Sequence, residues 1–248
     1  MKITSRKNER VQHLKRLGAD ALYRAECGEI LCDGYKLLGE AIASKLELHE
    51  VFAAGELPVD LPKGTTLYET ERDIIEAISQ QKTPQSVVFS AKMPEFGALG
   101  SLEGSIILEN IQDPGNVGTV IRTANAFGIK RVVLVGDCAD AYSPKTIRAT
   151  MGAAFKKPVY RLTLDELTEL KGTTPIYAAA LSDEASDIRS ISLRNCAVAV
   201  GNEGRGLTSE MIASCDGTII IPMTPYCESL NASVAASVLM WEMTKDNL

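Results

Sequence analysis

The stretch NIQDPGNVGTVIRTANAFG, residues 110–128, begins with turn-forming residues and continues with the spacing of an amphipathic helix. We expect Asn116 to cap this helix, because asparagine accepts hydrogen bonds from the free amides at a helix start. Arg122 lies off the apolar face, so its side chain is predicted to project toward a ligand. An exposed arginine in a salt bridge is the simpler interpretation of Arg122 taken alone. The predicted buried face comprises Val117, Val120, Ile121, Ala124 and Phe127.

Five apolar runs around this stretch predict a parallel sheet. Continuous runs of valine and isoleucine are typical of strands that are buried on both faces of such a sheet. Residues 231–243 (NASVAASVLMWEM) then predict a last helix that is apolar almost all round, and such a helix is buried in its domain or at a subunit interface. The five runs are SIILE (105–109), RVVLVG (131–136), PIYAAA (175–180), CAVAVG (196–201) and GTIIIP (217–222).

A shorter α/β segment precedes these strands. The stretch AKMPEFGALGSLEG, residues 91–104, is rich in glycine and proline and has little periodicity, which indicates a boundary. We therefore divide the chain into a domain of residues 1–97 and a domain of residues 98–248. In the first domain the pattern predicts helices over residues 5–25, 35–45 and 71–80 and strands within residues 28–34, 48–54, 65–69 and 86–91.

Charge is distributed unevenly along the chain. The net charge of the 248 residues is −6, but residues 1–25 carry seven Lys/Arg against two acidic residues, a local charge of +5. Residues 142–164 carry five further basic residues and no acidic one. Two basic patches on an acidic body are typical of local phosphate-binding surfaces, although a solvated helix face explains either patch alone equally well. The candidate phosphate-binding residues are Arg6, Lys7, Arg10, Lys15, Arg16, Lys145 and Arg148.

Several classes of protein are disfavoured by patterns that the sequence lacks. The six cysteines form no Cys-x-x-Cys pair and no zinc pattern with histidine, so we expect reduced thiols and no metal site. His13 and His49 are the only histidines, and there is no Gly-x-Ser-x-Gly elbow, which argues against a serine hydrolase. No apolar run reaches transmembrane length and the first residues lack a signal-peptide pattern, so a cytoplasmic protein is expected.

Two further polar segments follow predicted strands of the second domain. VAVGNEGRGL, residues 198–207, runs from a buried strand into glycines that allow a ligand to approach backbone amides closely. It matches neither a Walker A loop nor Gly-x-Gly-x-x-Gly, and a tight strand–helix turn is its alternative interpretation. IPMTPYCESLNASVA, residues 221–235, brings Ser229 and Asn231 to the start of the last helix, where a simple cap is the alternative. Because ligands bind beyond the carboxyl ends of parallel strands, we expect the three segments to converge there.

Taken together, the three segments resemble the SpoU branch of the SPOUT class of RNA ribose 2′-O-methyltransferases. The matching patterns are N-x-x-D-P-x-N-x-G-x-x-x-R from Asn110 to Arg122, G-x-E-x-x-G-L from Gly201 to Leu207, and I-P-M followed by S-L-N-x-S-x-A from Ile221 to Ala235. The stretches TSRKNERVQHLKRL (4–17) and GEILCDGYKLLGEAI (28–42) also resemble the small α/β RNA-binding domain that precedes many SpoU catalytic domains. The resemblance covers nearly the whole chain.

The resemblance implies an α/β fold, in which a trefoil-knotted parallel sheet forms the methyltransferase domain behind a small α/β RNA-binding domain. It implies S-adenosylmethionine as the cofactor. It also implies a homodimer through the last helix and the helix of the first motif, in which Arg122 can act on the cofactor of the other subunit. The implied cofactor pocket lies around Ala199, Gly201, Ile221, Met223 and Leu230. The implied catalytic residues are Arg122, Asn110, Glu203, Ser229 and Asn231.

In this interpretation a ribose 2′-hydroxyl attacks an already activated methyl group, so positioning supplies much of the rate without a histidine. We assign Arg122 to a bidentate clamp on the adjacent phosphate, because a guanidinium is hard to deprotonate, although a role as the base stays open. The two basic patches become RNA contacts, with ribosomal RNA as the expected substrate and transfer RNA as the alternative. Two different classes of protein also stay open: a non-catalytic RNA-binding or ribosome-assembly factor on the same fold, and a small-molecule enzyme with a Rossmann-type sheet.

Overall fold

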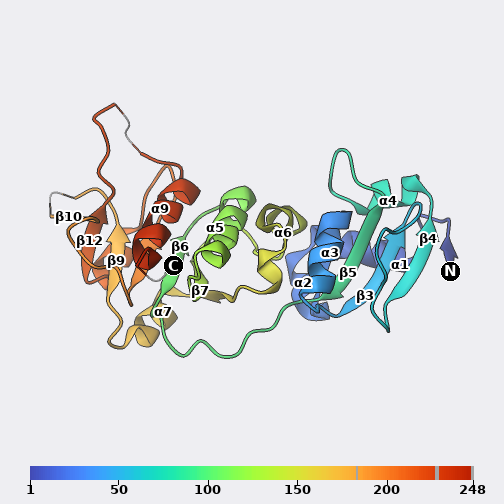
Figure 1. The fold of residues 1–248 in the computed structure, drawn as a ribbon, viewed down its shortest axis with the longest axis horizontal. Coiled ribbons are helices and arrows are strands. Elements are labelled where there is room, and N and C mark those ends of the chain that lie inside the picture. Colours follow the sequence, from blue (N-terminus) through green and yellow to red (C-terminus); the bar gives the residue numbers. More distant parts are fainter. Residues whose placement is uncertain (183, 227–228, 247–248) are drawn as a thin grey trace. The chain divides into compact units, whose positions relative to one another are not determined.

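The chain folds into two compact units (Figure 1). The first unit comprises Met1–Glu95 and Asp140–Lys156, and the second comprises Phe96–Ala139 and Lys157–Leu248. The first change of unit, after Glu95, falls within the region where the sequence indicates a boundary. The return of residues 140–156 to the first unit is not indicated by the sequence pattern. The structure is a computed structural model that describes residues 1–182, 184–226 and 229–246.

A five-stranded sheet forms the centre of the first unit, in the order β1-β4-β3-β5-β2. β5 runs antiparallel to β2 and β3, whereas β4 runs parallel to its neighbours β1 and β3. The strands are β1 (Lys2–Ile3), β2 (Glu29–Asp33), β3 (Leu48–Ala53), β4 (Thr66–Thr70) and β5 (Val87–Lys92). The helices are α1 (Glu9–Ala19), α2 (Ala21–Cys27), α3 (Tyr35–Ala43), α4 (Arg72–Ile78) and α6 (Pro144–Thr150), followed by the 3₁₀ turn η1 (Ala153–Phe155).

Apolar side chains cover both faces of this sheet. α1 and α4 pack on one face, where Leu14 and Ile75 are completely buried. α3 packs on the other face, in a second cluster that contains Leu38. Ile147 of α6 and Phe155 of η1 belong to this second cluster. The core of the first unit is therefore completed by two residues from a distant part of the chain.

The helix that the sequence predicts over residues 5–25 is two helices in the structure. α1 ends before Asp20, whose backbone is extended, with φ −120° and ψ 111°. The side chain of Asp20 then caps α2 by accepting a hydrogen bond from the amide of Tyr23 at 3.0 Å. Aspartate interrupts the helix here because its carboxylate offers the backbone an alternative hydrogen-bond acceptor.

Seven strands form a fully parallel sheet at the centre of the second unit, in the order β10-β12-β9-β11-β6-β7-β8. The parallel α/β sheet expected for this part of the chain is thus confirmed, and the five apolar runs form five of its strands. The strands are β6 (Ser105–Glu109), β7 (Arg131–Val135), β8 (Val159–Leu162), β9 (Ile176–Ala179), β10 (Ser186–Asp187), β11 (Ala197–Val200) and β12 (Gly217–Ile220). The helices are α5 (Pro114–Ala126), α7 (Leu164–Lys171), α8 (Ser209–Ser214) and α9 (Ala232–Thr244).

The helix of the first motif begins earlier than the sequence predicts. Asp113, not Asn116, caps α5, because its carboxylate accepts a hydrogen bond from the amide of Asn116 at 2.9 Å. Pro114 occupies the first turn, where its missing amide hydrogen costs nothing. The side chain of Asn116 is therefore available for other contacts. Of the predicted buried face, Val117, Val120, Ile121 and Ala124 are buried, and Phe127 is half-buried just beyond the helix.

The last helix buries one face and exposes another. Asn231 caps α9 by accepting hydrogen bonds from the amides at the start of the helix, which is the alternative interpretation that the sequence leaves open. α9 packs against α5, and Trp241 meets Phe127 edge-on with ring centroids 5.7 Å apart. Val234 and Trp241 are each 47% exposed. With the half-buried Val238 between them they follow the i, i+4, i+7 spacing of one helix face, and we call these three residues the α9 stripe.

The cysteines among the described residues are all free thiols. Burial raises the pKa of the Cys196 thiol to about 12 and that of the Cys215 thiol to about 11, so both are protonated at neutral pH. Cys227 lies outside the described residues. In the described ranges, no helix combines the length and the hydropathy that crossing a bilayer requires.

Candidate functional site

A hollow of about 420 Å³ lies at the carboxyl ends of β9, β11 and β12, three neighbouring strands of the second unit. Ligands of open parallel sheets bind at this edge. The walls are mainly apolar and include a few polar side chains, which is the usual composition of a small-molecule site. Ala199, one of the predicted cofactor residues, is instead completely buried in the core of the sheet. The predicted site residues that line the hollow are Gly201, Glu203, Ile221, Met223, Ser229 and Leu230.

The loop after β11 closes on itself beside the hollow. The amide of Asn202 donates to the carbonyl of Gly206 at 3.2 Å, and the amide of Gly206 donates back at 2.8 Å. The returning chain lies so close to Gly201 that a Cβ atom there would be 2.2 Å from the carbonyl carbon of Gly206 and 2.3 Å from the nitrogen of Leu207. Gly206 has a φ of +69°, a conformation that favours glycine. Gly201 and Gly206 of the second motif are therefore required for the conformation of this loop.

Asn116 joins the three sequence motifs through its side chain. Its Nδ2 donates a hydrogen bond to the carboxylate of Glu203 in the second motif. Its Oδ1 accepts a hydrogen bond from Nδ2 of Asn231 in the third motif, at 3.2 Å. We call these residues the Asn116–Glu203–Asn231 network, which reaches the hollow through Glu203. This role is not predicted from the sequence, where Asn116 is expected to be the helix cap; Asp113 and Pro114, which already form a complete helix start, are the signal that could have revealed it.

Asn110 has a different place from the other predicted catalytic residues. It lies directly after β6 with a φ of +55°, in the left-handed region. Its Oδ1 accepts a hydrogen bond from the amide of Asp137 at 2.8 Å, and its carbonyl accepts one from Nδ2 of Asn202 at 3.1 Å. Asn110 therefore connects the end of β6 to the loops after β7 and β11, and it does not line the hollow.

Arg122 is exposed on α5 and, among the described residues, has no hydrogen-bond or ion-pair partner. It follows Asn116 by six residues, which corresponds to a rotation of about 240° around a helix with 3.6 residues per turn. The two side chains therefore leave α5 in different directions. The structure does not bring Arg122 into the Asn116–Glu203–Asn231 network of the same chain.

All three arginines that are predicted to bind phosphate in α1 and the segment before it are paired with acidic residues. Arg6 meets Asp73 at 3.1 Å, Arg16 meets Asp20 at 3.5 Å, and Arg10 forms an ion pair with the nearly buried Glu50. Lys7 and Lys15 are exposed and have no ion-pair partner within the part of the chain that the structure describes. The excess positive charge available to a polyanion is therefore smaller than the sequence indicates.

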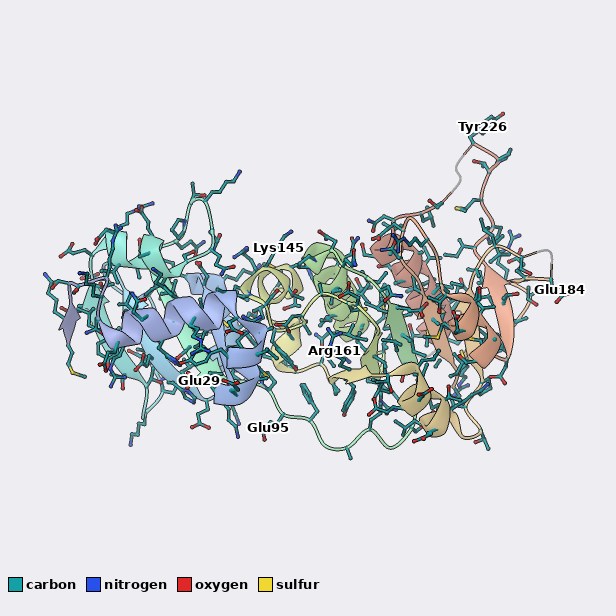
Figure 2. All side chains as sticks on the ribbon, turned by 180° about the vertical axis from the view of Figure 1, so that it is seen from behind. Glu29, Glu95, Lys145, Arg161, Glu184 and Tyr226 are labelled. Atoms are coloured by element: carbon teal, nitrogen blue, oxygen red, sulfur yellow. The ribbon has the colours of Figure 1, made fainter. Side chains whose placement is uncertain are left out.

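Of the five basic residues of 142–164, Lys157 is buried, Arg148 is half-buried, and Lys145, Lys156 and Arg161 are exposed. Lys157 is buried and donates to the carbonyl of Ile129 at 2.5 Å, and burial lowers the pKa of its ammonium. Arg161, which is labelled in Figure 2, donates to the carbonyls of Gly136 and Cys138, both at 2.9 Å. Burial raises the pKa of Asp33, and the charge of the half-buried Arg148 opposes that rise. Of the residues predicted here to bind phosphate, Lys145 is exposed on α6.

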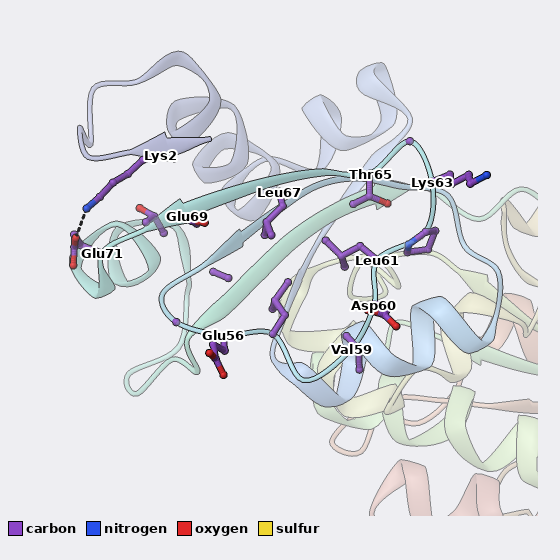
Figure 3. Close-up of a pocket in the computed structure, with 16 residues that line it drawn as sticks. Lys2, Glu56, Val59, Asp60, Leu61, Lys63, Thr65, Leu67, Glu69 and Glu71 are labelled. Atoms are coloured by element: carbon purple, nitrogen blue, oxygen red, sulfur yellow. Dashed lines mark ion pairs between the residues drawn. The ribbon is translucent and has the colours of Figure 1, made fainter.

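A larger hollow, of about 910 Å³, lies in the first unit between β4 and the loop of residues 55–65 (Figure 3). Its lining has an excess of acidic residues, so it does not fit a polyanion. Lys2, which pairs with Glu71 at 3.1 Å, and Lys63 are its basic residues. Among the described residues, no group of three or more His, Cys, Asp or Glu side chains is arranged to hold a metal ion. The acidic residues of the lining are Glu56, Asp60, Glu69 and Glu71.

Two models of known protein families match this chain. A model of the SpoU rRNA Methylase family matches residues 104–241, more than half of the chain. The chain belongs to this family. A model described as the MRM3-like substrate binding domain matches residues 8–88, all of which lie in the first unit.

Several relatives of this chain align with most or all of its length. The 23S rRNA (guanosine(2553)-2′-O)-methyltransferase RlmP of Bacillus subtilis is 34% identical, over 97% of this chain and 98% of that protein. Human mitochondrial rRNA methyltransferase 3 is 28% identical, over 89% of this chain and 68% of that protein. The AdoMet-bound rRNA methyltransferase from Sinorhizobium meliloti shares the fold with a TM-score of 0.87 at 25% identity, over 100% of this chain and 98% of that chain.

Family membership brings S-adenosylmethionine as the methyl donor. The hollow at β9, β11 and β12 fits this group, because apolar walls suit an adenine ring and main-chain groups can read its polar edge. The close turn at Gly201 presents backbone without an intervening side chain. Gly201, Ile221, Met223 and Leu230 are the predicted cofactor residues that line this hollow and would hold the group.

Proposed function

We propose that this chain transfers a methyl group to a ribose 2′-hydroxyl of ribosomal RNA. The observation that carries the proposal is the Asn116–Glu203–Asn231 network, which links all three SpoU motifs and reaches the apolar hollow through Glu203. The similarity to RlmP over nearly the full length of both chains supports ribosomal RNA as the substrate.

The residues at the hollow are suited to orienting a nucleotide. S-adenosylmethionine, when bound, supplies a methyl group on a positively charged sulfur, which is already activated for transfer. The protein has to bring the ribose oxygen into line with that group, and good orientation supplies up to about 7–11 kcal/mol in such reactions. Glu203 and Ser229 line the hollow and offer a carboxylate and a hydroxyl for hydrogen bonds to the ribose, while Asn231, which does not line it, holds Asn116 in the network.

We assign Arg122 the role of a clamp on the phosphate next to the target ribose. Its guanidinium is exposed and has no competing partner among the described residues, so it is available to an RNA phosphate. A guanidinium binds phosphate through two parallel hydrogen bonds, which fixes the direction as well as the distance. A guanidinium is hard to deprotonate, so the role of a clamp suits this side chain better than that of a general base.

We further propose that the first unit selects the RNA. The match of residues 8–88 to a substrate-binding domain supports this role. Lys7 and Lys15 are exposed and have no ion-pair partner among the described residues, so they are the predicted contacts that remain suited to phosphates. Arg6, Arg10 and Arg16 can contribute only if an RNA phosphate competes with their acidic partners.

We also propose that the chain acts as a homodimer through α5 and α9, and that Arg122 serves the hollow of the partner subunit. The α9 stripe leaves apolar surface uncovered, as expected at a subunit interface. Arg122 leaves α5 in a different direction from Asn116, so a second subunit explains how it reaches a hollow.

Two inactive variants test this arrangement. Arg122→Ala retains a hollow but lacks the clamp, and Gly201→Ala retains the clamp but has a distorted hollow. Mixed dimers, co-expressed with two different tags and purified through both, are expected to recover about half of the wild-type activity, because one of two sites is complete. Mixed dimers without activity would place Arg122 at the hollow of its own subunit. Failure of the tags to co-purify would contradict the dimer.

The proposed reaction is tested with purified protein, tritiated S-adenosylmethionine and unmodified 23S rRNA. We expect the tritiated methyl group to be attached to the ribose 2′-oxygen of a single nucleotide. The nucleotide in the name of RlmP, guanosine 2553, is the first to examine. Transfer RNA and 16S rRNA are the control substrates, since methylation of transfer RNA alone would favour the alternative substrate. Cofactor binding in calorimetry without methylation of any RNA would favour a non-catalytic RNA-binding factor.

We also propose that the protein lies in the cytoplasm, because its proposed substrate is ribosomal RNA.

A further inference from the structure

Glu109 is a buried carboxylate that neither the three motifs nor the proposed mechanism uses. It is the last residue of β6, directly before Asn110, and only 4% of it is exposed. Burying a carboxylate is costly unless its oxygen atoms accept hydrogen bonds. Its position at the carboxyl end of the sheet therefore raises the question of what it binds.

Both oxygens of Glu109 accept hydrogen bonds from one residue, Thr208. The amide of Thr208 donates to Oε2 at 2.8 Å, and its hydroxyl donates to Oε1 at 2.6 Å. The hydroxyl oxygen in turn accepts from the amide of Met211 at 3.1 Å, which caps α8. The three hydrogen bonds form one connected set. The amide of Met211 donates to the hydroxyl of Thr208, and the hydroxyl and amide of Thr208 donate to the two oxygens of Glu109.

Thr208 lies at the end of the loop that shapes the hollow. It directly follows Leu207, and Gly201, Gly206 and Leu207 all line the hollow. Near its start the same loop is attached to β6 through Asn202, whose Nδ2 donates to the carbonyl of Asn110 at 3.1 Å. Two consecutive residues at the end of β6 therefore hold the loop after β11 at both of its ends.

We propose that Glu109 is a positioning residue for the cofactor pocket: by binding Thr208 through both oxygens, it sets the shape of the loop from Gly201 to Leu207. The inference rests on the assignment of the hollow to S-adenosylmethionine. Thr208 presents two donors to Glu109, so a group with two acceptor atoms is required. Glutamine offers one acceptor oxygen and places an NH₂ group against the second donor.

The matched variants act on the two partners separately. Glu109→Gln keeps the size of the side chain and replaces one acceptor by a donor. Thr208→Val keeps the shape and the amide but removes the hydroxyl, and Thr208→Ser, which keeps both donors, is the control. The dissociation constant for S-adenosylmethionine is measured by calorimetry on the folded proteins, well below each melting temperature. The Michaelis constants for cofactor and RNA are measured in parallel.

Glu109→Gln is expected to weaken cofactor binding about tenfold, because an unsatisfied buried donor displaces the loop. Thr208→Val is expected to weaken it less, and Thr208→Ser to leave it unchanged. The double variant should lose less affinity than the product of the two single losses, as expected for residues in direct contact. The Michaelis constant for RNA should stay at the wild-type value in all four proteins.

A lowered melting temperature with unchanged cofactor affinity in both Glu109→Gln and Thr208→Val would show that the pair only stabilises α8, and would overturn the inference. An equal rise in the Michaelis constants for cofactor and RNA would overturn it as well. If Glu109→Gln does not fold, the comparison of Thr208→Val with Thr208→Ser decides. If the wild-type protein binds S-adenosylmethionine but methylates no RNA, the proposed function is contradicted. The dissociation constants of the variants for the cofactor then still test the role of Glu109.

Discussion

Replacing Arg122 by alanine is expected to lower kcat for methyl transfer about 10²–10³-fold while leaving the affinity for S-adenosylmethionine unchanged. The proposed clamp acts on the RNA phosphate, so its loss removes the alignment of the ribose and not the cofactor pocket. The side chain is exposed and has no partner among the described residues, so the melting temperature should not change. Single-turnover transfer at saturating RNA measures the chemical step, and calorimetry measures the cofactor.

Two further substitutions make the Arg122 result specific. Arg122→Lys retains the charge and loses the two parallel hydrogen bonds, so we expect an intermediate loss of about tenfold or more. Arg194→Ala, at an exposed arginine of the same unit that does not line the hollow, is the control and should retain full activity. Near-wild-type turnover by Arg122→Lys would show that the fork geometry of the guanidinium is unimportant.

Replacing Gly201 by alanine is expected to weaken cofactor binding by about 100-fold or more. The added Cβ atom would lie 2.2 Å and 2.3 Å from backbone atoms of Gly206 and Leu207, and backbone cannot move aside as a flexible side chain can. The loop must therefore open, and this displaces the residues that line the hollow. Overpacking of this kind costs several kcal/mol, and about 2.7 kcal/mol corresponds to 100-fold in affinity. Calorimetry with S-adenosylmethionine measures the loss.

Gly204→Ala is the matched control for this prediction. Gly204 lies in the same loop, but its added Cβ atom would meet only Oδ1 of Asn202, at an ordinary contact distance of 3.5 Å. We expect cofactor affinity within the error of the wild type. Equal binding by the Gly201 and Gly204 variants would mean that the hollow does not hold the cofactor through this loop.

The central strands of the second unit could be predicted from the sequence because burial on both faces of a parallel sheet leaves a local record, whereas its two edge strands, β8 and β10, have no buried residue and were not predicted. SIILE at residues 105–109 and CAVAVG at 196–201 are examples, because they form β6 and β11, in which every residue is buried. The cap at Asn231 was one of two interpretations of that residue, since one asparagine precedes one apolar helix, and the structure shows that it forms. At the first motif two residues had suitable side chains, and only the structure shows that Asp113 caps α5 and that Asn116 does not.

Contacts between distant parts of the sequence could not be predicted. Arg10 and Arg16 have the same local pattern of a basic helix face, yet Arg10 pairs with Glu50, from another element. The same limit applies to Lys157, which points into the protein. The three motifs could be expected to meet because the carboxyl ends of parallel strands lie at one edge. The trefoil knot and the separate roles of the two domains stay predictions.

The return of residues 140–156 to the first unit has a consequence for how the chain folds while it is being synthesised. The first 95 residues contain the whole five-stranded sheet, but Ile147 and Phe155, which complete one side of its core, follow much later. At usual rates of translation the ribosome reaches residue 155 roughly 3–12 s after residue 95. During that interval α3 covers this apolar face of the nascent sheet, but the part that Ile147 and Phe155 occupy is uncovered. The nascent chain therefore passes through a stage at which a chaperone has a surface to bind, and which ends only when the second unit is partly made.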